Sequence, residues 1–332
     1  MSKSVTLSDI AKICGTSTVT VSKALADKKG VGPELRERIK KTADELGYTA
    51  IHSVSISNNR MVGVLIPEKF MAPKGSFYWS LYNELVVRFK EYGFFCLMEI
   101  LTQQDEQQLV LPDIIKEHRV SAFISLGQVS RDYAELLYKE MPALLQLDYY
   151  ISGFSADHVI TNGFGGCYEI TSYLISVGHK NIGFIGTVRA TSSIFDRYMG
   201  YTKAMLEHGL AVKDEWILDD RDGTDFVDIS FPETLPTAFV CNCDETAYNV
   251  IRQLKEKGIS VPHDISIVGF DNYLISELCD PPITTMGIDV PKMACAARDI
   301  LLARINDPDM KKQEVNISCD LIVKGSTRVI DQ

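Results

Sequence analysis

The chain has 332 residues, 45% of them hydrophobic and 23% charged, so it is long enough for about two globular domains and is not intrinsically disordered. No apolar run approaches the ~20 residues of a membrane-spanning helix, and the N-terminus has no apolar signal segment, which predicts a cytoplasmic protein. The net charge of −10 is uneven: residues 1–60 carry ten Lys or Arg and six Asp or Glu, a balance of +4, which leaves −14 for the rest. A basic N-terminal segment followed by an acidic remainder suggests that the N-terminal segment binds a polyanion.

The eight cysteines are scattered along the chain, and no two of them form a C-x-x-C pair. Zinc binding is therefore not expected, and the simplest interpretation is a set of buried free thiols. We expect neither a metal nor a cofactor.

Three short helices are predicted in residues 1–48. Thr6 can cap the first helix, and Gly15 can end it. Ser17 is a good cap for the second helix, and Pro33 suits the first turn of the third. Apolar residues at helical spacing give each helix one buried face: Leu7, Ile10, Ala11 and Cys14; then Val21, Ala24 and Leu25; then Leu35, Ile39, Ala43 and Leu46.

This arrangement matches the trihelical plan of helix-turn-helix DNA-binding domains, in which the second helix enters the major groove. Thr18 and Val19 would face base edges, and Lys23 could reach guanine or a phosphate. The residues expected to contact DNA through bases or phosphates are Thr6, Ser17, Thr18, Val19, Thr20, Ser22 and Lys23. The alternative is a small three-helix bundle with solvated lysines.

From residue 61 the pattern alternates between apolar strands and amphipathic helices. Strands are predicted at 62–66, 94–101, 120–125 and 143–147, with helices at 77–92, 105–118 and 130–140. The plan restarts after a strand at 159–161, with strands at 182–186, 216–219, 237–241 and 265–270 and helices at 164–177, 194–208 and 244–257. Such alternation predicts two doubly wound parallel sheets, and therefore two α/β lobes with a cleft between them.

Ligands of doubly wound sheets bind outside the carboxyl ends of the strands. Several polar or aromatic residues fall there, and an arginine with carboxylates and aromatic rings suits a small polyhydroxylated ligand. The candidate effector contacts are Phe77, Tyr78, Asp148, Ser193, Arg197, Cys243, Asp244 and Asp271. Structural roles stay open beside this one: helix capping for the last two aspartates, a surface ion pair for the arginine, and core packing for the aromatic pair and the thiol.

The chain resembles the LacI/GalR family of bacterial transcription regulators. The resemblance is carried by a set of segments in the family's order: VTLSDIAKICGTSTVTVSKAL (5–25), RERI (36–39), ELGY (45–48), VGHKNIGFIG (177–186), RYMGY (197–201), CDETA (243–247), SIVGFD (266–271) and PITT (282–285). Each piece alone is weak, but the ordered set covers nearly the whole chain.

The resemblance implies a helix-turn-helix domain at 1–48, a hinge at 49–61 and an effector-binding and dimerisation domain at 62–332 with a periplasmic-binding-protein-like fold. Within that domain, lobe 1 would comprise about 62–160 and 291–318, and lobe 2 about 161–290 and 319–332. Family members place an aromatic pair, an arginine and an aspartate against the effector, and Phe77, Tyr78, Arg197 and Asp271 match them. Two positions depart from the family: Cys243 stands where an asparagine is usual, and residues 219–222 read Asp-Asp-Arg-Asp where an aromatic residue is often found.

The linker at 49–60 also departs from the family pattern. It has neither the Pro-Asn pair nor the Ala-Arg-x-Leu of the usual hinge helix. Ile56 could still be the apolar wedge that enters the minor groove. The alternative is an extended tether without a wedge.

These observations predict a transcription regulator, most simply a repressor, that binds a pseudo-palindromic operator as a homodimer under control of a small carbohydrate-like effector. A solute-binding protein for transport would need export, which the basic N-terminal segment and the missing signal argue against. An enzyme is not favoured, because the sequence has no H-E-x-x-H, no G-x-S-x-G and no nucleotide-binding glycine motif.

Overall fold

The computed structural model describes residues 7–25, 30–45, 60–71, 77–223 and 225–330. The chain divides into two compact units, Met1–Arg60 and Met61–Gln332, and each is described by itself. Of the predicted DNA contacts, Thr6 and Ile56 lie outside the described residues, as do the side chains of Val19 and Ser22.

The first unit contains the three predicted helices, α1 (Leu7–Cys14), α2 (Thr18–Leu25) and α3 (Pro33–Glu45). Gly15, with φ +62°, ends α1 in the left-handed conformation that glycine adopts at little cost. One apolar cluster holds the helices together: Ile10, Ala11, Cys14, Val21, Ala24, Ile39 and Ala43 are buried, and Leu25, Val31 and Leu35 pack against them. The predicted apolar faces within the described residues are therefore confirmed.

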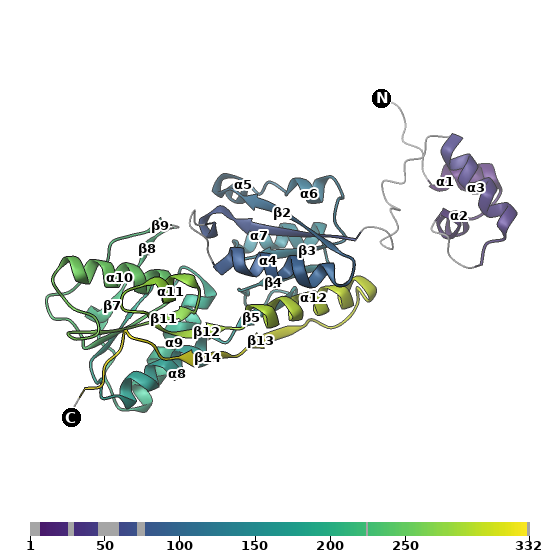
Figure 1. Ribbon diagram of the computed structural model, residues 1–332. Coiled ribbons are helices and arrows are strands. Elements are labelled where there is room, and N and C mark those ends of the chain that lie inside the picture. Colours follow the sequence, from purple (N-terminus) through teal and green to yellow (C-terminus); the bar gives the residue numbers. More distant parts are fainter. Residues whose placement is uncertain (1–6, 26–29, 46–59, 72–76, 224, 331–332) are drawn as a thin grey trace. The chain divides into compact units, whose positions relative to one another are not determined.

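The second unit consists of two lobes, each built on a six-stranded sheet (Figure 1). The sheet of lobe 1 has the order β13-β5-β4-β3-β1-β2, and all its strands are parallel. Its strands are β1 (Met61–Pro67), β2 (Phe95–Leu101), β3 (Ala122–Leu126), β4 (Leu144–Leu147), β5 (Asp157–Thr161) and β13 (Glu314–Ile317).

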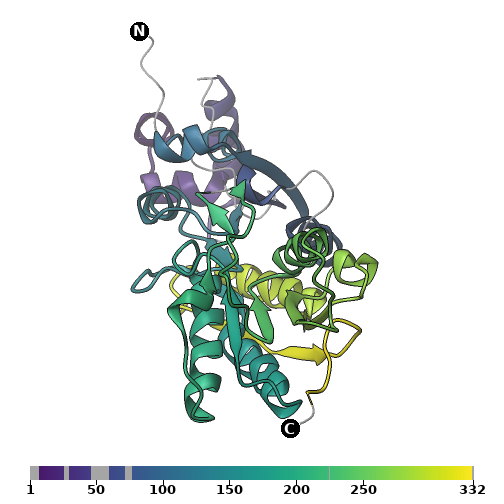
Figure 2. The same ribbon diagram turned by 90° about the vertical axis from the view of Figure 1, so that its left-hand side faces the viewer.

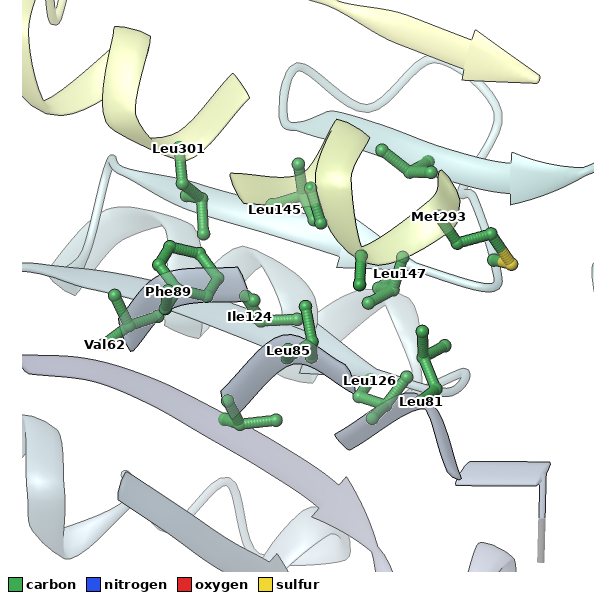
Figure 3. Packing of buried hydrophobic residues seen from close by; sticks show 14 of the residues in the cluster. Val62, Leu81, Leu85, Phe89, Ile124, Leu126, Leu145, Leu147, Met293 and Leu301 are labelled. Atoms are coloured by element: carbon green, nitrogen blue, oxygen red, sulfur yellow. The ribbon is translucent and has the colours of Figure 1, made fainter. Parts of the chain in front are cut away.

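Helices cover both faces of this sheet because successive strand residues point to opposite faces. On one face α4 (Phe77–Lys90) and α12 (Val290–Asn306) pack over the strands, as Figure 3 shows for Leu85 and Phe89 of α4 and Leu301 of α12. On the other face α6 (Asp113–Lys116) and α7 (Arg131–Glu140) pack around Phe123.

The predicted single helix at 105–118 is wrong. The structure has two short helices there, α5 (Gln103–Gln107) and α6, separated by a turn in which Leu109 has φ 54°. Pro112 directly precedes α6, where it lacks the N–H that a continuous helix requires.

The sheet of lobe 2 has the order β14-β12-β11-β10-β6-β7, and only β14 is antiparallel to its neighbour. Its strands are β6 (Ile182–Ile185), β7 (Ile217–Leu218), β10 (Ala238–Cys241), β11 (Ser266–Asp271), β12 (Thr284–Ile288) and β14 (Cys319–Ile322). Its helices are α8 (Gly163–Ser176), α9 (Ser192–Glu207), α10 (Asp244–Glu256) and α11 (Leu274–Leu278). Two short 3-10 helices, η1 (Glu68–Phe70) and η2 (Asp214–Trp216), lie in the connections.

The chain passes from one sheet to the other three times, after β5, after β12 and after β13. A small hairpin of β8 (Arg221–Asp222) and β9 (Asp225–Phe226) lies on the side of lobe 2 that faces lobe 1 (Figures 1 and 2). The predicted pair of doubly wound lobes is therefore confirmed. Among the described residues no helix combines the length and the apolar character needed to cross a membrane.

Candidate functional site

A cavity of about 150 Å³ lies between the two lobes, at the carboxyl ends of their parallel strands. Lobe 1 contributes residues of η1 and α4, and lobe 2 contributes residues of α9, the β8–β9 hairpin and the ends of β10 and β11. Seven of the eight residues predicted to contact an effector line it: Phe77, Tyr78, Asp148, Ser193, Arg197, Cys243 and Asp271.

On the lobe 1 side, Asp148 directly follows β4 and is buried. Its backbone adopts φ 67°, a left-handed conformation that aspartate and asparagine tolerate better than most residues. The Tyr78 hydroxyl donates a hydrogen bond to Asp148 Oδ2 at 3.0 Å. Burial raises the pKa of Asp148 to about 6, although Arg197 and this hydrogen bond act in the opposite direction.

On the lobe 2 side, Arg197 of α9 is buried with its guanidinium in contact with three groups. Nη2 lies 3.3 Å from Asp271 Oδ1, and Nη1 donates to the carbonyl of Asn242 at 2.5 Å. The guanidinium carbon lies 3.9 Å from the centre of the Phe270 ring. Burial raises the pKa of Asp271, while the charge of Arg197 lowers it. The pair therefore offers both donors and acceptors to a ligand with hydroxyl groups.

The eighth predicted contact, Asp244, is not among the residues that line the cavity. It is fully buried at the start of α10, where it accepts hydrogen bonds from Thr285 Oγ1 at 2.6 Å and from the Tyr273 amide at 3.2 Å. Gly269 makes room for it, since a Cβ there would lie 2.2 Å from Asp244 Oδ1. Asp244 thus fixes the chain segment that presents Tyr273 to the cavity.

Several residues that line the cavity were not predicted from the sequence. Arg221 and Phe226 enter the cavity from the hairpin, and Tyr273, whose hydroxyl donates to Glu245, closes it beside Asp271. The departure from the family pattern at 219–222 was the one available signal for Arg221. Nothing local indicated that Phe226, five residues further on, would line the same cavity.

In the first unit, the structure describes four of the predicted DNA contacts: Ser17, Thr18 and Thr20 lie at the N-terminal end of α2, and Lys23 lies in its last turn. Ser17 caps the helix, because its Oγ accepts a hydrogen bond from the Thr20 amide at 3.1 Å. The hydroxyls of Ser17 and Thr20 are 2.9 Å apart and share a second hydrogen bond. The side chains of Thr18 and Lys23 are exposed, which leaves them accessible to a partner.

Two family models match the chain. Residues 6–50 match the model of bacterial regulatory proteins of the lacI family, and residues 171–327 match the model of periplasmic binding protein-like domains. The chain belongs to the LacI/GalR family of bacterial transcription regulators. As a member of the LacI/GalR family it is a DNA-binding transcription repressor and not an enzyme.

Several known proteins are similar to the chain over nearly its whole length. The HTH-type transcriptional repressor PurR of Pasteurella multocida is 28% identical over 97% of this chain and 98% of its own length. The structure of a transcriptional regulator CelR–cellobiose complex has 21% identity and a TM-score of 0.69, and the match covers 97% of this chain and 99% of that one. A lac repressor dimer bound to operator and the anti-inducer ONPF has 20% identity and a TM-score of 0.67, with 98% and 100% covered.

Proposed function

We propose that the protein binds a pseudo-palindromic operator as a homodimer in the cytoplasm, and that a small carbohydrate effector in the cavity between its lobes sets its affinity for the operator. The observation that carries this proposal is the composition of the cavity wall. Asp148 from lobe 1 and the Arg197–Asp271 pair from lobe 2 face the same space. A ligand that contacts both lobes favours one arrangement of the lobes over another, which is what coupling to a second site requires.

The chemistry of the wall favours a polyhydroxylated ring over an apolar ligand. Hydroxyl groups both donate and accept, so they can pair with carboxylates and with a guanidinium in one site. The rings of Phe77, Tyr78 and Phe226 offer flat surfaces for the apolar faces of a sugar. The cellobiose in the CelR complex is a ligand of this class in a protein of the same fold.

A larger groove of about 720 Å³ on lobe 1 is less suitable. Its wall comes from η1, α5 and the segment before α7, all of which belong to lobe 1. A ligand bound there would touch one lobe only, and so it would not couple the two lobes directly.

Two exposed apolar surfaces support the dimer. The strand β2 is an edge of the lobe 1 sheet, and Phe95 at its start is 62% exposed. On lobe 2, Leu274 and Leu278 of α11 are exposed, the latter by 73%. Unpaired sheet edges and clustered apolar side chains are features of protein–protein interfaces. A dimer would also present two helix-turn-helix domains, one from each copy of the chain, to the two half-sites of a palindrome.

The first test joins effector screening to operator binding. Sugars, sugar phosphates, nucleosides and amino acids are screened with the full-length protein by thermal shift, because a ligand that binds only the folded state raises the melting temperature. The hit is then added to a gel-shift titration with an operator selected from pooled palindromes. We expect Arg197→Ala to bind the operator as the wild type does but to lose the effector response, because the substitution removes the guanidinium between Asp271 and the ligand.

An exposed arginine far from the cavity, Arg119, supplies the control, and Arg119→Ala should keep both activities. An Arg197→Ala protein that responds at the normal effector concentration would contradict the site. A hit among nucleosides and none among sugars would contradict the carbohydrate class while leaving the regulated repressor in place.

A further inference from the structure

We propose that Arg221 is a specificity-determining residue that binds an oxyanion of the effector, a carboxylate or a phosphate, so that the preferred ligand is an acidic sugar derivative and not a neutral sugar. The inference rests on the proposed function, because it assigns a ligand class to the same cavity. It is carried by the way in which Asp220 holds the arginine.

Asp220 is buried behind the residues that line the cavity, with 1% of its surface exposed, and its carboxylate accepts several hydrogen bonds. Its Oδ1 accepts from the Thr187 amide at 2.9 Å and from Arg221 Nε at 3.0 Å. Its Oδ2 accepts from Arg221 Nη2 at 2.8 Å, Asn242 Nδ2 at 2.5 Å and Thr246 Oγ1 at 2.6 Å. Five donors on one carboxylate keep it ionised, and the pKa of Asp220 is lowered to about 2 although burial acts in the opposite direction.

The hydrogen bonds to Asp220 fix the orientation of the Arg221 guanidinium before any ligand binds. Asp220 occupies Nε and Nη2, which form one edge of the Arg221 fork. The Phe226 ring lies 4.8 Å from the guanidinium carbon, and Thr187 Oγ1 both accepts from the Arg221 amide and donates to its carbonyl. Such preorganisation lowers the entropy that the side chain loses when it binds a ligand.

The remaining edge of the fork consists of Nη1 and the second N–H of Nη2, and Nη2 also donates to Asn242 Oδ1 at 3.4 Å. No described residue forms a hydrogen bond with Arg221 Nη1, and Asp220 is the only described carboxylate within salt-bridge distance of this arginine. Arg221 nonetheless lines the cavity. Nη1 is therefore left to donate a charge-assisted hydrogen bond to an oxygen of a carboxylate or phosphate in the cavity.

Two lining residues whose electrostatics act on Arg221, Cys243 and Tyr78, are uncharged at neutral pH. Burial raises the pKa of the Cys243 thiol to about 12 and raises that of the Tyr78 hydroxyl well above its usual value. The other arginine of the cavity, Arg197, already has a carboxylate partner within the cavity wall, Asp271. The cavity therefore offers two kinds of charged group: carboxylates such as Asp148 and Asp271, which suit hydroxyl groups, and the cation Arg221, whose only carboxylate partner among the described residues, Asp220, does not line the cavity.

The test compares matched ligands on the full-length protein by isothermal titration calorimetry. Glucose, glucuronate, glucose 6-phosphate and glucosamine are compared, and the same four forms of galactose, so that the charge varies while the ring stays constant. We expect at least one acidic form to bind about tenfold or more tightly than its neutral parent, and the advantage to shrink at high ionic strength. The carboxylate and phosphate arms identify which oxyanion is preferred.

Substitutions then locate the preference. Arg221→Met should abolish the advantage of the acidic form and change the affinity for the neutral parent much less, while Arg119→Met on the surface should leave both unchanged. Arg221→Met leaves the buried Asp220 carboxylate without its ion-pair partner, so this single variant can fail to fold. The double variant Asp220→Asn with Arg221→Gln removes both charges. It should show the same loss of preference for the acidic form.

The outcomes separate this inference from the proposed function. Neutral sugars that bind as tightly as the acidic forms and alter operator affinity would overturn the role of Arg221 alone. The same follows if the double variant keeps the acidic preference. A protein whose operator affinity responds to none of the compounds screened would contradict the proposed function itself.

Discussion

Asp148 shows how a single residue in the cavity is held in an unfavourable state. Its left-handed backbone directs the carboxylate toward Tyr78, and burial raises its pKa to about 6. A carboxyl whose pKa is higher in the folded than in the unfolded chain destabilises the fold where it is ionised. This cost is absent below about pH 4, grows as the pH rises to about 6, and stays constant above it. The cavity thus contains a charge that stability alone would not select.

We therefore expect Asp148→Asn to stabilise the protein by roughly 1–3 kcal/mol at pH 8, because the amide keeps an acceptor for Tyr78 and carries no charge. The gain should vanish near pH 4. Urea unfolding followed by tryptophan fluorescence measures it, and both tryptophans, Trp79 and Trp216, lie in the second unit. The exposed Asp132→Asn should show no such gain. A destabilised Asp148→Asn at pH 8 would refute this account of the carboxylate.

At the level of elements, the crossing of α8 and α9 depends on one residue without a side chain. A Cβ on Gly200 of α9 would lie 2.1 Å from the carbonyl oxygen of Phe164 in α8. The two helices therefore pack backbone against backbone at this point. The same helix α9 carries Arg197 one turn earlier, so the crossing also sets the depth at which the arginine enters the cavity.

Gly200→Ala should therefore push the helices apart and lower the free energy of unfolding by roughly 1–3 kcal/mol or more. The same fluorescence-detected urea titration measures this loss. Gly325→Ala is the matched control, because its Cβ would have nothing closer than 3.4 Å and should be tolerated. Equal stabilities of the two variants would show that α8 and α9 can separate at no cost.

At the scale of the whole molecule, exposed apolar side chains lie at several separate places on the second unit. Phe95 at the β2 edge and Leu278 on α11 belong to the two surfaces proposed as the dimer interface. Leu206 on α9 is also exposed, by 63%, but lies outside those surfaces. The same substitution, to glutamate, at each of these three residues can therefore test where the dimer interface lies.

We expect Phe95→Glu and Leu278→Glu to shift the protein toward monomers, because each buries a charge in an apolar interface, and to weaken operator binding with it. Leu206→Glu should remain dimeric. Sedimentation equilibrium measures the assembly state, and the gel shift measures the operator affinity. Dissociation by Leu206→Glu, with the other two variants still dimeric, would place the interface elsewhere.

The sequence alone was sufficient for most of the fold because periodicity reports burial directly. Apolar residues spaced at i, i+3 and i+4 identified the helices α1, α2 and α3, and short apolar runs identified strands such as β1 and β11. The carboxyl ends of those strands then indicated most of the cavity wall, since parallel strands all end at the same edge of a sheet. The break at Pro112 was missed because the apolar spacing continues through it.

The tertiary structure decided what each polar side chain contacts. Asp244 and Asp271 both follow or end apolar strands, yet Asp271 lines the cavity while Asp244 is taken up by Thr285 and the Tyr273 amide. The partners of Asp220 come from positions 187, 221, 242 and 246, which only the folded chain brings together. Local patterns carry the burial and the period of a segment. The direction of a side chain at a strand end depends on single backbone angles and on distant neighbours, and these exist only once the sheets have formed.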